Sequence, residues 1–394
     1  MPIATLDDLE LDSRRVLLRE DLNVPMKDGA ILDFTRIDAA LPTLRRLHRA
    51  NACTVILSHL GRPNGVEDAR FSLRQVAEAL AHRLKMPVAF ASNCIGEPAR
   101  TAIERLEPGA FVLLENLRFH RGEEENDEDF ARALARNGDC YVDDAFGTVH
   151  RAHASTEALA RLLPSAAGPL LESELKALSG LLGAAKHPFV CAIGGAKVRD
   201  KVGIFTHLMD RVDAFCVGGG MANTFLAAQG IDVGSSLRDD DLDPAREILV
   251  HADARKVALY LPTDAVVAPS FDADDRSHVV SIADVGSDMI LDIGPATAKV
   301  YADVLSAAKS IVFNGPMGVY EKESYRAGTR AVGDALARAT KHGAFTVVGG
   351  GDAAAAASLL GFANRVSHVS TGGGATLEYL EGRTLPGVAA LERT

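Results

Sequence analysis

Short apolar runs alternate along the whole chain with longer segments whose apolar residues recur at helical spacing. An apolar run at Val16–Leu18 precedes a helical stripe that begins at Ile37, and a second apolar run follows at Thr54–Leu57. Strands that are apolar along their whole length are typical of parallel sheets covered by helices on both faces. The pattern therefore predicts repeated β-α-β units and an α/β fold.

The alternation is interrupted near residue 170. Pro164, Gly168 and Pro169 precede a stretch with leucines at helical spacing, and the alternation restarts at Phe189–Ile193. Further strands are predicted at Phe215–Val217, Val257–Leu261, Met289–Ile293, Ile311–Phe313, Phe345–Val348 and Val366–Val369. We predict two doubly wound, Rossmann-like domains with parallel sheets, joined by a helical hinge. Residues 1–170 form the first domain, 171–185 the linker helix and 186–375 the second domain.

One helix start carries a specific signal. Ser72 is followed three residues later by Gln75, ahead of apolar residues at helical spacing. In a capping box, two such side chains satisfy backbone N–H groups that have no partner within the helix. The spacing therefore predicts a capping box at this position.

Composition excludes several classes of protein. The chain has 394 residues, 47% hydrophobic and 24% charged, which is typical of a globular protein and not of a disordered or fibrous one. Its net charge of -11 comes without a basic arm, so we expect no nucleic-acid partner.

No apolar run reaches membrane-spanning length, and the N-terminal segment lacks a signal-peptide pattern, so we expect a cytoplasmic protein without a membrane partner. The five cysteines form no C-x-x-C pair, which favours reduced, mostly buried thiols.

Basic residues follow the predicted strands of the first half, where open α/β sheets bind their ligands. Arg36 opens the first helix, and the other candidates are Asp21 and Asn23 in R-E-D-L-N-V-P, His59 and Arg62 in S-H-L-G-R-P, Arg118 in E-N-L-R-F-H, and Arg151 in V-H-R-A-H. A guanidinium grips phosphate and carboxylate oxygens in pairs, so convergent arginines predict a site for a small polyanion. The alternative is that each arginine pairs with a local acid on the surface.

Glycines follow the strands of the second half. Candidates for a nucleotide or phosphate site are Gly194, Gly195, Gly219, Asn314, Pro316, Glu321, Gly350, Gly351, Asp352, Gly372, Gly373 and Gly374, with Lys197 and Lys201 nearby. Glycine-rich turns let backbone N–H groups approach phosphate at the positive end of a helix. Close strand–helix packing is the alternative explanation for a glycine triplet. Asp352 is a candidate Mg²⁺ ligand or a plain helix N-cap, and Glu321 is a candidate for ribose or a surface residue.

Two familiar nucleotide-binding motifs are missing. The chain has no G-x-x-x-x-G-K-[ST] loop and no G-x-G-x-x-G opening a β-α-β unit. An arginine-lined half and a glycine-lined half nevertheless suit phosphoryl transfer from a nucleotide to a small anionic acceptor. Such a transfer requires positioning and cations more than it requires a nucleophile or base.

With these residues in view, the chain resembles the phosphoglycerate kinase family over almost its whole length. The resemblance lies in the segments SHLGRP, DAFGTVHRAHAS, GGAKV, GGGMANTFL, NGPMGV and STGGGA, in that order. It implies reversible phosphoryl transfer between 1,3-bisphosphoglycerate and ADP, giving 3-phosphoglycerate and ATP, with Mg²⁺ as cofactor. It also implies a monomer, and a hinge that closes to align the two substrates.

The resemblance also assigns roles to residues. Asp21, Asn23, Arg36, His59, Arg62, Arg118 and Arg151 would bind 3-phosphoglycerate in the N-terminal domain. Gly194, Gly195, Lys201, Gly219, Asn314, Pro316, Glu321, Gly350, Gly351 and Asp352 would bind the nucleotide, with Asp352 on the metal. Arg36, Lys197 and the backbone of Gly372, Gly373 and Gly374 would surround the phosphoryl group. Residues 376–394 would return to complete the N-terminal domain.

Three positions depart from the family's pattern, and three other functions remain open. Ser173, Phe313 and Ala353 stand where the family commonly has lysine, tryptophan and a hydroxyl residue, and Ala353 lacks a hydroxyl beside the expected phosphates. The alternatives are a kinase for another carboxylate or phosphate acceptor, a binding or surface-attachment protein, and a nicotinamide-linked oxidoreductase. The last lacks its sequence motif.

Overall fold

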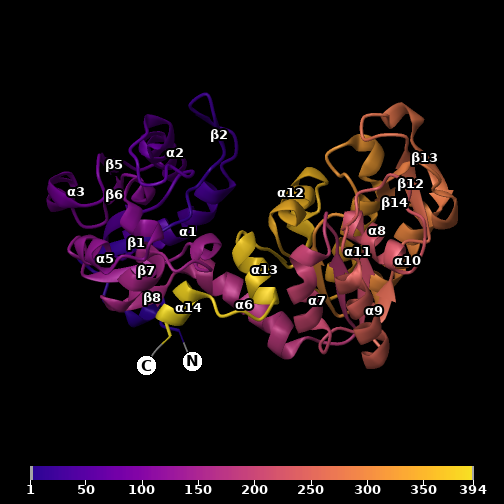
Figure 1. Ribbon diagram of the computed structural model, residues 1–394. Coiled ribbons are helices and arrows are strands. Elements are labelled where there is room, and N and C mark those ends of the chain that lie inside the picture. The colour runs from indigo at the N-terminus through magenta and orange to yellow at the C-terminus, as the bar shows by residue number, and fades with distance from the viewer. Residues whose placement is uncertain (1–2, 393–394) are drawn as a thin grey trace. The chain divides into compact units, whose positions relative to one another are not determined.

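The computed structural model describes residues 3–392, and the chain separates into two units (Figure 1). The first contains the residues up to Lys176 together with those from Thr384 onward, and the second contains Ala177–Arg383. The boundary falls inside helix α6 (Pro169–Ala184), which covers most of the predicted linker. Residues 1–2 and 393–394, which the predicted first domain includes, lie outside the described residues.

The sheet of the first unit is parallel throughout, as predicted. Its order is β5 (Val88–Ala91), β6 (Phe111–Leu114), β4 (Cys53–Leu57), β1 (Arg15–Arg19), β7 (Cys140–Asp143) and β8 (Ser165–Ala167). The helices are α1 (Thr35–Arg49), α2 (Arg74–Leu84), α3 (Gly96–Glu104), α4 (Arg121–Glu124) and α5 (Glu128–Ala135). A small hairpin of β2 (Met26–Lys27) and β3 (Ala30–Ile31) follows β1 in the chain.

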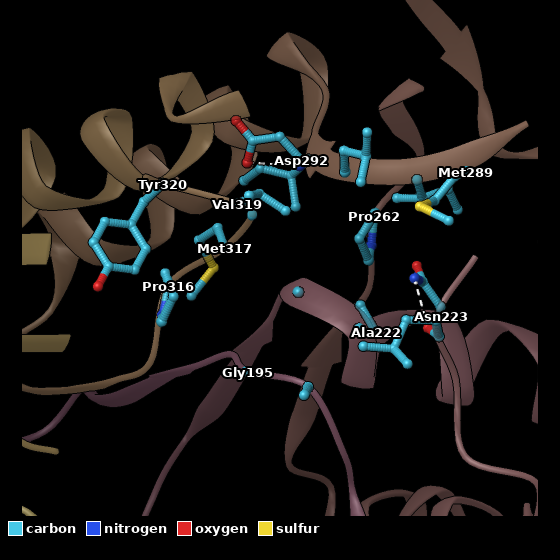
Figure 2. Close-up of a pocket in the computed structure, with 18 of the residues that line it drawn as sticks. Gly195, Ala222, Asn223, Pro262, Met289, Asp292, Pro316, Met317, Val319 and Tyr320 are labelled. Carbon is cyan, nitrogen blue, oxygen red and sulfur yellow. Dashed lines mark hydrogen bonds between the residues drawn. The ribbon is translucent and has the colours of Figure 1, made fainter. Parts of the chain in front are cut away.

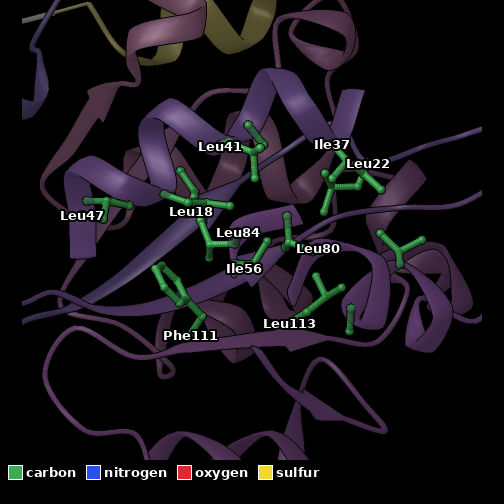
Figure 3. Packing of buried hydrophobic residues seen from close by; sticks show 14 of the residues in the cluster. Leu18, Leu22, Ile37, Leu41, Leu47, Ile56, Leu80, Leu84, Phe111 and Leu113 are labelled. Carbon is green, nitrogen blue, oxygen red and sulfur yellow. The ribbon is translucent and has the colours of Figure 1, made fainter. Parts of the chain in front are cut away.

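A hydrophobic core fills the space between this sheet and two of its helices. Figure 3 shows the side chains involved: Leu18, Ile56, Phe111 and Leu113 from the strands, Ile37, Leu41 and Leu47 from α1, and Leu80 and Leu84 from α2. Together with Leu44, the residues from α1 recur every three or four positions, and the two from α2 are four apart, which places them on one face of each helix. This core holds the strand ends, and hence the loops that follow them, in fixed positions.

The second unit repeats the arrangement with a second parallel sheet. Its order is β11 (Ala258–Tyr260), β10 (Ala214–Val217), β9 (Phe189–Ile193), β15 (Ser310–Asn314), β16 (Phe345–Val348) and β17 (His368–Val369). The helices are α7 (Val202–Leu208), α8 (Gly219–Ala228), α9 (Asp243–Arg255), α10 (Pro295–Ala307), α11 (Ala327–Lys341), α12 (Gly351–Leu359) and α13 (Gly374–Leu380). Two doubly wound α/β units are thus confirmed.

One predicted strand belongs to a different sheet. Met289–Ile293 forms β14, as the apolar run suggests, but it pairs antiparallel with β12 (Asp264–Ala268), which also pairs with β13 (His278–Ser281). The expectation that this segment continues the parallel pattern is therefore wrong. An apolar run indicates a buried strand, but it carries no information on the direction in which its neighbour runs. A separate small apolar core contains Ala265 and Val267 of β12 together with Leu226 of α8.

The C-terminal segment divides between the two units. Helix α13 packs against α7, so residues 376–383 group with the second unit, and not with the first as expected. Residues 384–392 return to the first unit, where α14 (Pro386–Ala390) packs beside Ala154–Ala158 (Figure 1). The backbone N–H of Gly387 donates a hydrogen bond to the carbonyl of Val149 at 2.9 Å.

The predicted capping box at Ser72 does not form. Helix α2 has Leu73 as its N-cap, and the Ser72 hydroxyl donates to Glu115 Oε2 at 2.7 Å. The other Glu115 oxygen accepts the backbone N–H of Leu73 at 2.8 Å. A buried carboxylate from the end of the neighbouring strand therefore caps this helix start, a long-range contact that the local spacing does not show.

Two further findings bear on the composition. The cysteines Cys53, Cys94, Cys140, Cys191 and Cys216 are all buried free thiols. Within residues 3–392, no helix is long and apolar enough to cross a membrane.

Replacing a core leucine tests this account of the first unit. Leu80→Ala should lower the free energy of unfolding by about 2–5 kcal/mol, because the cavity left in the core cannot be refilled. Leu32→Ala, at a leucine that is 62% exposed, should change it by less than about 0.5 kcal/mol. Urea unfolding followed by circular dichroism measures both, and equal effects would contradict the core assignment.

Candidate active site

The basic residues of the first unit gather around one histidine. His59 lies in the loop after β4 and is buried, with 3% of its surface exposed. Burial lowers the pKa of His59 well below its usual range, and the charges of Arg19, Arg118, Arg36 and Arg151 lower it further. These arginines come from four separate segments of the chain. The structure therefore brings together three of the predicted arginines, Arg36, Arg118 and Arg151.

Arg36 is held in place by the two polar residues predicted beside it. Its Nη1 donates to Asp21 Oδ1 at 3.0 Å and to the carbonyl of Asn23 at 2.7 Å. The side-chain oxygen of Asn23 accepts the backbone N–H of Gly61 at 2.9 Å, which ties this segment to the loop that carries His59. Asp21 and Asn23 thus orient the cationic site, and the Arg36 side chain remains 37% exposed.

Arg118 is buried with part of its hydrogen-bonding capacity unused. Only 3% of its side chain is exposed, and its Nη1 donates to the carbonyl of Gly61 at 2.8 Å. Its Nε lies 3.4 Å from Glu124 Oε1 but makes no hydrogen bond within the described residues. Burial lowers the pKa of Arg118 to about 10. A buried guanidinium with a free donor suits an anionic ligand.

The remaining basic residues are more accessible. Arg62 is exposed in the same loop as His59, and Arg151 is half-buried after β7. The local-pairing alternative applies to Arg36, whose acid is Asp21, and to Arg118, whose Nε lies 3.4 Å from Glu124 Oε1. The pair of Arg36 and Asp21 is itself part of the cluster.

The second unit contains a cavity of about 290 Å³ at the ends of its strands (Figure 2). Five of the predicted nucleotide residues line it: Gly195, Gly219, Pro316, Glu321 and Asp352. They come from the loops after β9 and β15, from the start of α8 and from the first turn of α12. Figure 2 shows the segment from Pro316 to Tyr320 along one wall.

The glycines of this region divide into two kinds. A side chain at Gly194 would place its Cβ 1.9 Å from the carbonyl oxygen of Pro316, so this glycine permits two loops to touch. Gly219 has a φ of +66° and donates its N–H to the carbonyl of Met317 at 2.8 Å. At Gly351 and Gly373, in contrast, a Cβ would meet nothing within 4 Å. The packing explanation therefore holds for Gly194, whereas the helix starts at Gly351 and Gly373 face open space.

Lys201 links two of these loops. Two of its three N–H groups donate to the carbonyls of Gly194 at 2.6 Å and Asn314 at 2.8 Å. Burial lowers the pKa of Lys201 to about 8, although the negative charge of Asp352 opposes this shift. Lys197 lies four residues earlier and is partly exposed. The Asn314 side chain donates to the carbonyl of Gly349 at 2.7 Å, which joins the loop after β15 to the loop before α12.

Asp352 is an exposed carboxylate in the first turn of α12, but it is not the helix N-cap. That position belongs to Gly350, which has a φ of +99°. Within residues 3–392, no group of three or more acidic, histidine or cysteine side chains could hold a metal ion. A Mg²⁺ ion here would thus need ligand oxygens from a bound nucleotide in addition to Asp352.

The last glycine triplet starts helix α13. The N–H of Gly372 donates to the Ser370 hydroxyl at 3.1 Å. Gly373 is the N-cap, with a φ of +52°, and Gly374 is the first residue of the helix. A left-handed conformation of this kind favours glycine.

The apolar walls of the cavity were missed by the sequence analysis. Met289 and Leu291 of β14 line it, together with Leu237, Phe271, Met317 and Val319. In the sequence such residues look like ordinary core. The available signal was the position of Met317 and Val319 immediately after Pro316. A glycine-lined cavity with apolar walls suits a flat aromatic base.

Hydrogen bonds from a lysine hold the loop that carries Phe271 in place. Lys322 Nζ donates to the carbonyl of Phe271 at 2.6 Å, to Asp272 Oδ1 at 3.0 Å and to Asp274 Oδ1 at 3.0 Å. The same ammonium group lies 4.2 Å from the centre of the Phe271 ring. Phe271 is 46% exposed, so these contacts are what hold it beside the cavity.

The departures from the family pattern lie in different surroundings. Ala353 and Phe313 are buried in the core of the second unit, and Ser173 is exposed on α6, where its hydroxyl donates to the carbonyl of Leu170 at 2.8 Å. The Ala353 side chain therefore points into the core.

The fold and the site together define a class: a two-unit α/β protein with a cluster of arginines in one unit and a glycine-lined cavity in the other. Comparison with known proteins gives the family. A family model described as phosphoglycerate kinase matches residues 6–383. Phosphoglycerate kinase from Thermomicrobium roseum is 50% identical over 389 residues, which cover 98% of each chain. The protein of the same name from Rhodospirillum centenum is 50% identical over 394 residues, covering 99% of this chain and 100% of the relative.

Solved structures agree with the sequence comparison. The structure of phosphoglycerate kinase from Coxiella burnetii is 42% identical and superposes with a TM-score of 0.90 over 99% of both chains. The enzyme from Pyrococcus horikoshii is 33% identical with a TM-score of 0.86, over 99% of this chain and 98% of that one. The chain therefore belongs to the phosphoglycerate kinase family, and is a kinase of glycolysis.

Lys322→Met should loosen the loop around Phe271, because it removes three hydrogen bonds and the cation above the ring. We expect amide hydrogen exchange in residues 269–276 to become roughly tenfold faster. Lys299→Met is the matched control, since that lysine is exposed and pairs only with Asp303 within the described residues. Unchanged exchange in Lys322→Met would show that the loop is held by other contacts.

Proposed function

We propose that the protein catalyses reversible, Mg²⁺-dependent transfer of a phosphoryl group between 1,3-bisphosphoglycerate and ADP, giving 3-phosphoglycerate and ATP. It would act as a monomer in the cytoplasm. Membership of the family supports the reaction. The observation that carries the proposal is that hydrogen bonds through Asn23 and Gly61 tie Arg36 and Arg118 to the loop that carries His59. The charges of these two arginines and of Arg151 also lower the pKa of His59, and such a group of cations suits a small acceptor with two anionic groups.

In this proposal the first unit binds the acceptor. Asp21 and Asn23 orient Arg36, while His59, Arg62, Arg118 and Arg151 supply donors to the carboxylate and phosphate oxygens. The acceptor domain then consists of the residues before α6 and the C-terminal segment. Several cations held close together repel one another, so a doubly anionic ligand relieves that repulsion when it binds.

The second unit binds the nucleotide. The base lies against Gly195 and Gly219, Glu321 meets the ribose, and Lys201 is close enough to Asp352 to sense its charge. Gly194, Asn314, Pro316, Gly350 and Gly351 shape the loops around the phosphates. Asp352 would hold Mg²⁺, which neutralises phosphate charge when it is bound. The open space at Gly351 leaves room for phosphate at the start of α12.

Transfer requires the two substrates to meet, and they bind in different units. We propose that movement about α6 brings them into line and excludes water from the acyl phosphate. Arg36, Lys197 and the N–H groups of Gly372, Gly373 and Gly374 would then surround the transferring phosphoryl group. The transition state is loose and carries charge on its equatorial oxygens, so cations and N–H groups stabilise it without a nucleophilic residue.

Acceptor-dependent turnover tests the reaction. ADP formation from MgATP should require both 3-phosphoglycerate and Mg²⁺. Arg36→Ala should reduce kcat on the order of 10³-fold, because it removes a cation from the transition state. Arg45→Ala, at an exposed arginine on the same helix, should leave the rate unchanged. ATP binding without acceptor-dependent turnover in the folded protein would overturn the assignment of the acceptor.

Proton uptake tests the nucleotide site. The pKa of Lys201 is about 8, below the usual lysine value, and an anionic nucleotide should raise it again. At pH 8.5 we expect nucleotide binding to take up roughly half a proton or more. Calorimetry in buffers of different ionisation enthalpy measures this number. Lys201→Arg keeps the charge but cannot release a proton, so its uptake should be smaller by that amount. Equal uptake in both proteins would contradict this role of Lys201.

A further inference from the structure

A fully buried arginine contacts the histidine at the centre of the cationic site. Arg19 has no exposed surface, and its Nη2 lies 3.1 Å from His59 Nδ1. Its Nη1 donates to the carbonyl of Glu20, and its Nε donates to the Ser155 hydroxyl at 2.9 Å. Each of its three nitrogens is thus engaged inside the protein. Arg19 is therefore placed to act on the site through His59.

The chemistry of this contact determines where the histidine carries its proton. A guanidinium has only N–H donors and stays protonated in proteins, so it cannot accept a hydrogen bond. His59 Nδ1 must then be the acceptor, which means that it carries no proton. The one ring proton of the neutral imidazole is on Nε2.

A buried carboxylate holds Arg19 in this position. Glu123 is fully buried and accepts the Ser155 hydroxyl at 2.6 Å and the Ser155 backbone N–H at 2.9 Å. Burial raises the pKa of Glu123, whereas the charge of Arg19, the two hydrogen bonds from Ser155 and the charge of Arg118 favour its ionised form. Glu123, Ser155, Arg19 and His59 therefore form one continuous chain of hydrogen bonds, which runs from the interior to the acceptor site.

The four charged groups that most affect the pKa of His59 all act in the same direction. Arg19 comes from β1, Arg36 from α1, Arg118 from the turn after β6, and Arg151 from the segment after β7. All four are cations, and each opposes the gain of a second proton by the ring. The positive charge of the site thus belongs to the arginines, and His59 stays neutral.

We propose that Arg19, held by Ser155 and Glu123, is a positioning residue that fixes His59 as a neutral imidazole with its proton on Nε2. His59 then donates a hydrogen bond from Nε2 to an oxygen of the acceptor, a role that rests on the proposed function. It neither accepts nor releases a proton during the reaction. A ligand that presents an N–H or O–H donor at this point is disfavoured, whereas a carboxylate or phosphate oxygen is accepted.

Nitrogen NMR of the full chain with ¹⁵N-labelled histidine tests the tautomer directly. His59→Gln identifies the His59 signals among those of the twelve histidines. In the protein without substrate, we expect an unprotonated Nδ1 and a protonated Nε2 at every pH between about 5.5 and 8. A proton on Nδ1, or titration of His59 near the usual histidine pKa, would overturn the proposal.

Variants of the hydrogen-bond chain test the role of Arg19. Arg19→Met removes the donor to Nδ1, so His59 should show a mixture of tautomers and should protonate at higher pH. Ser155→Ala is the milder variant, which interrupts the link to Glu123 while Arg19 remains, and it should shift the tautomer signal in the same direction. If the signals of both folded variants match those of the wild type, Arg19 does not control the ring.

Kinetics separate this role from a structural one. The pH dependence of the KM for 3-phosphoglycerate should differ between Ser155→Ala and the wild type, beyond the part that comes from titration of the ligand's own phosphate. His59→Gln, which keeps a donor near the Nε2 position, should bind the acceptor on the order of tenfold more tightly than His59→Asn. Adding 3-phosphoglycerate should move the Nε2 signal of the wild type. Acceptor-dependent turnover with an unmoved Nε2 signal would overturn the donor role and leave the proposed reaction standing.

Discussion

The structure of the first unit must hold several arginines close together despite the electrostatic repulsion between their guanidinium groups. Like charges repel strongly where water is scarce, so each guanidinium needs a fixed acceptor. Arg36 has Asp21 and a carbonyl, Arg118 has the carbonyl of Gly61, and Arg19 is linked through Ser155 to Glu123. These acceptors fix the arginines but leave positive charge at the strand ends. A small anion can then lower the free energy of the site by neutralising that charge.

In the second unit, backbone groups and one lysine occupy the strand ends where the first unit has arginine side chains. Glycines let the loops after β9 and β15 touch, and Lys201 joins them through two carbonyls. At the helix starts Gly351 and Gly373 a side chain would meet nothing within 4 Å, which leaves room for a ligand, and apolar walls suit a flat base. The same α/β scaffold thus carries side-chain cations in one unit and glycine turns in the other. The proposed function requires this difference, because it assigns the acceptor to one unit and the nucleotide to the other.

The parallel sheets and the strand-end residues could be predicted because both follow from local pattern. Apolar runs mark the strands, and the loops after them must meet at one edge of a parallel sheet. What could not be predicted depends on contacts between distant residues. Glu115, which is distant in the sequence, accepts the N–H at the start of α2 in place of Gln75. Met289–Ile293 forms a strand as predicted, but it pairs antiparallel with β12. Arg19 appears in the sequence as one more basic residue, and only its burial against His59 shows a different role. In the sequence, Phe271 cannot be distinguished from an ordinary surface residue. The structure shows that Lys322 donates a hydrogen bond to its carbonyl and lies over its ring.

The proposed function requires that an acceptor bound at the arginine cluster receives the phosphoryl group on its carboxylate. A single turnover with MgATP labelled in the γ-phosphate, in the presence of 3-phosphoglycerate and hydroxylamine, tests it most directly. Hydroxylamine attacks an acyl phosphate at its carbonyl carbon, which forms a hydroxamate and releases the labelled phosphate. One hydroxamate is expected for each labelled phosphate released. Labelled phosphate without hydroxamate, or label retained in a phosphate ester that hydroxylamine does not cleave, would contradict it.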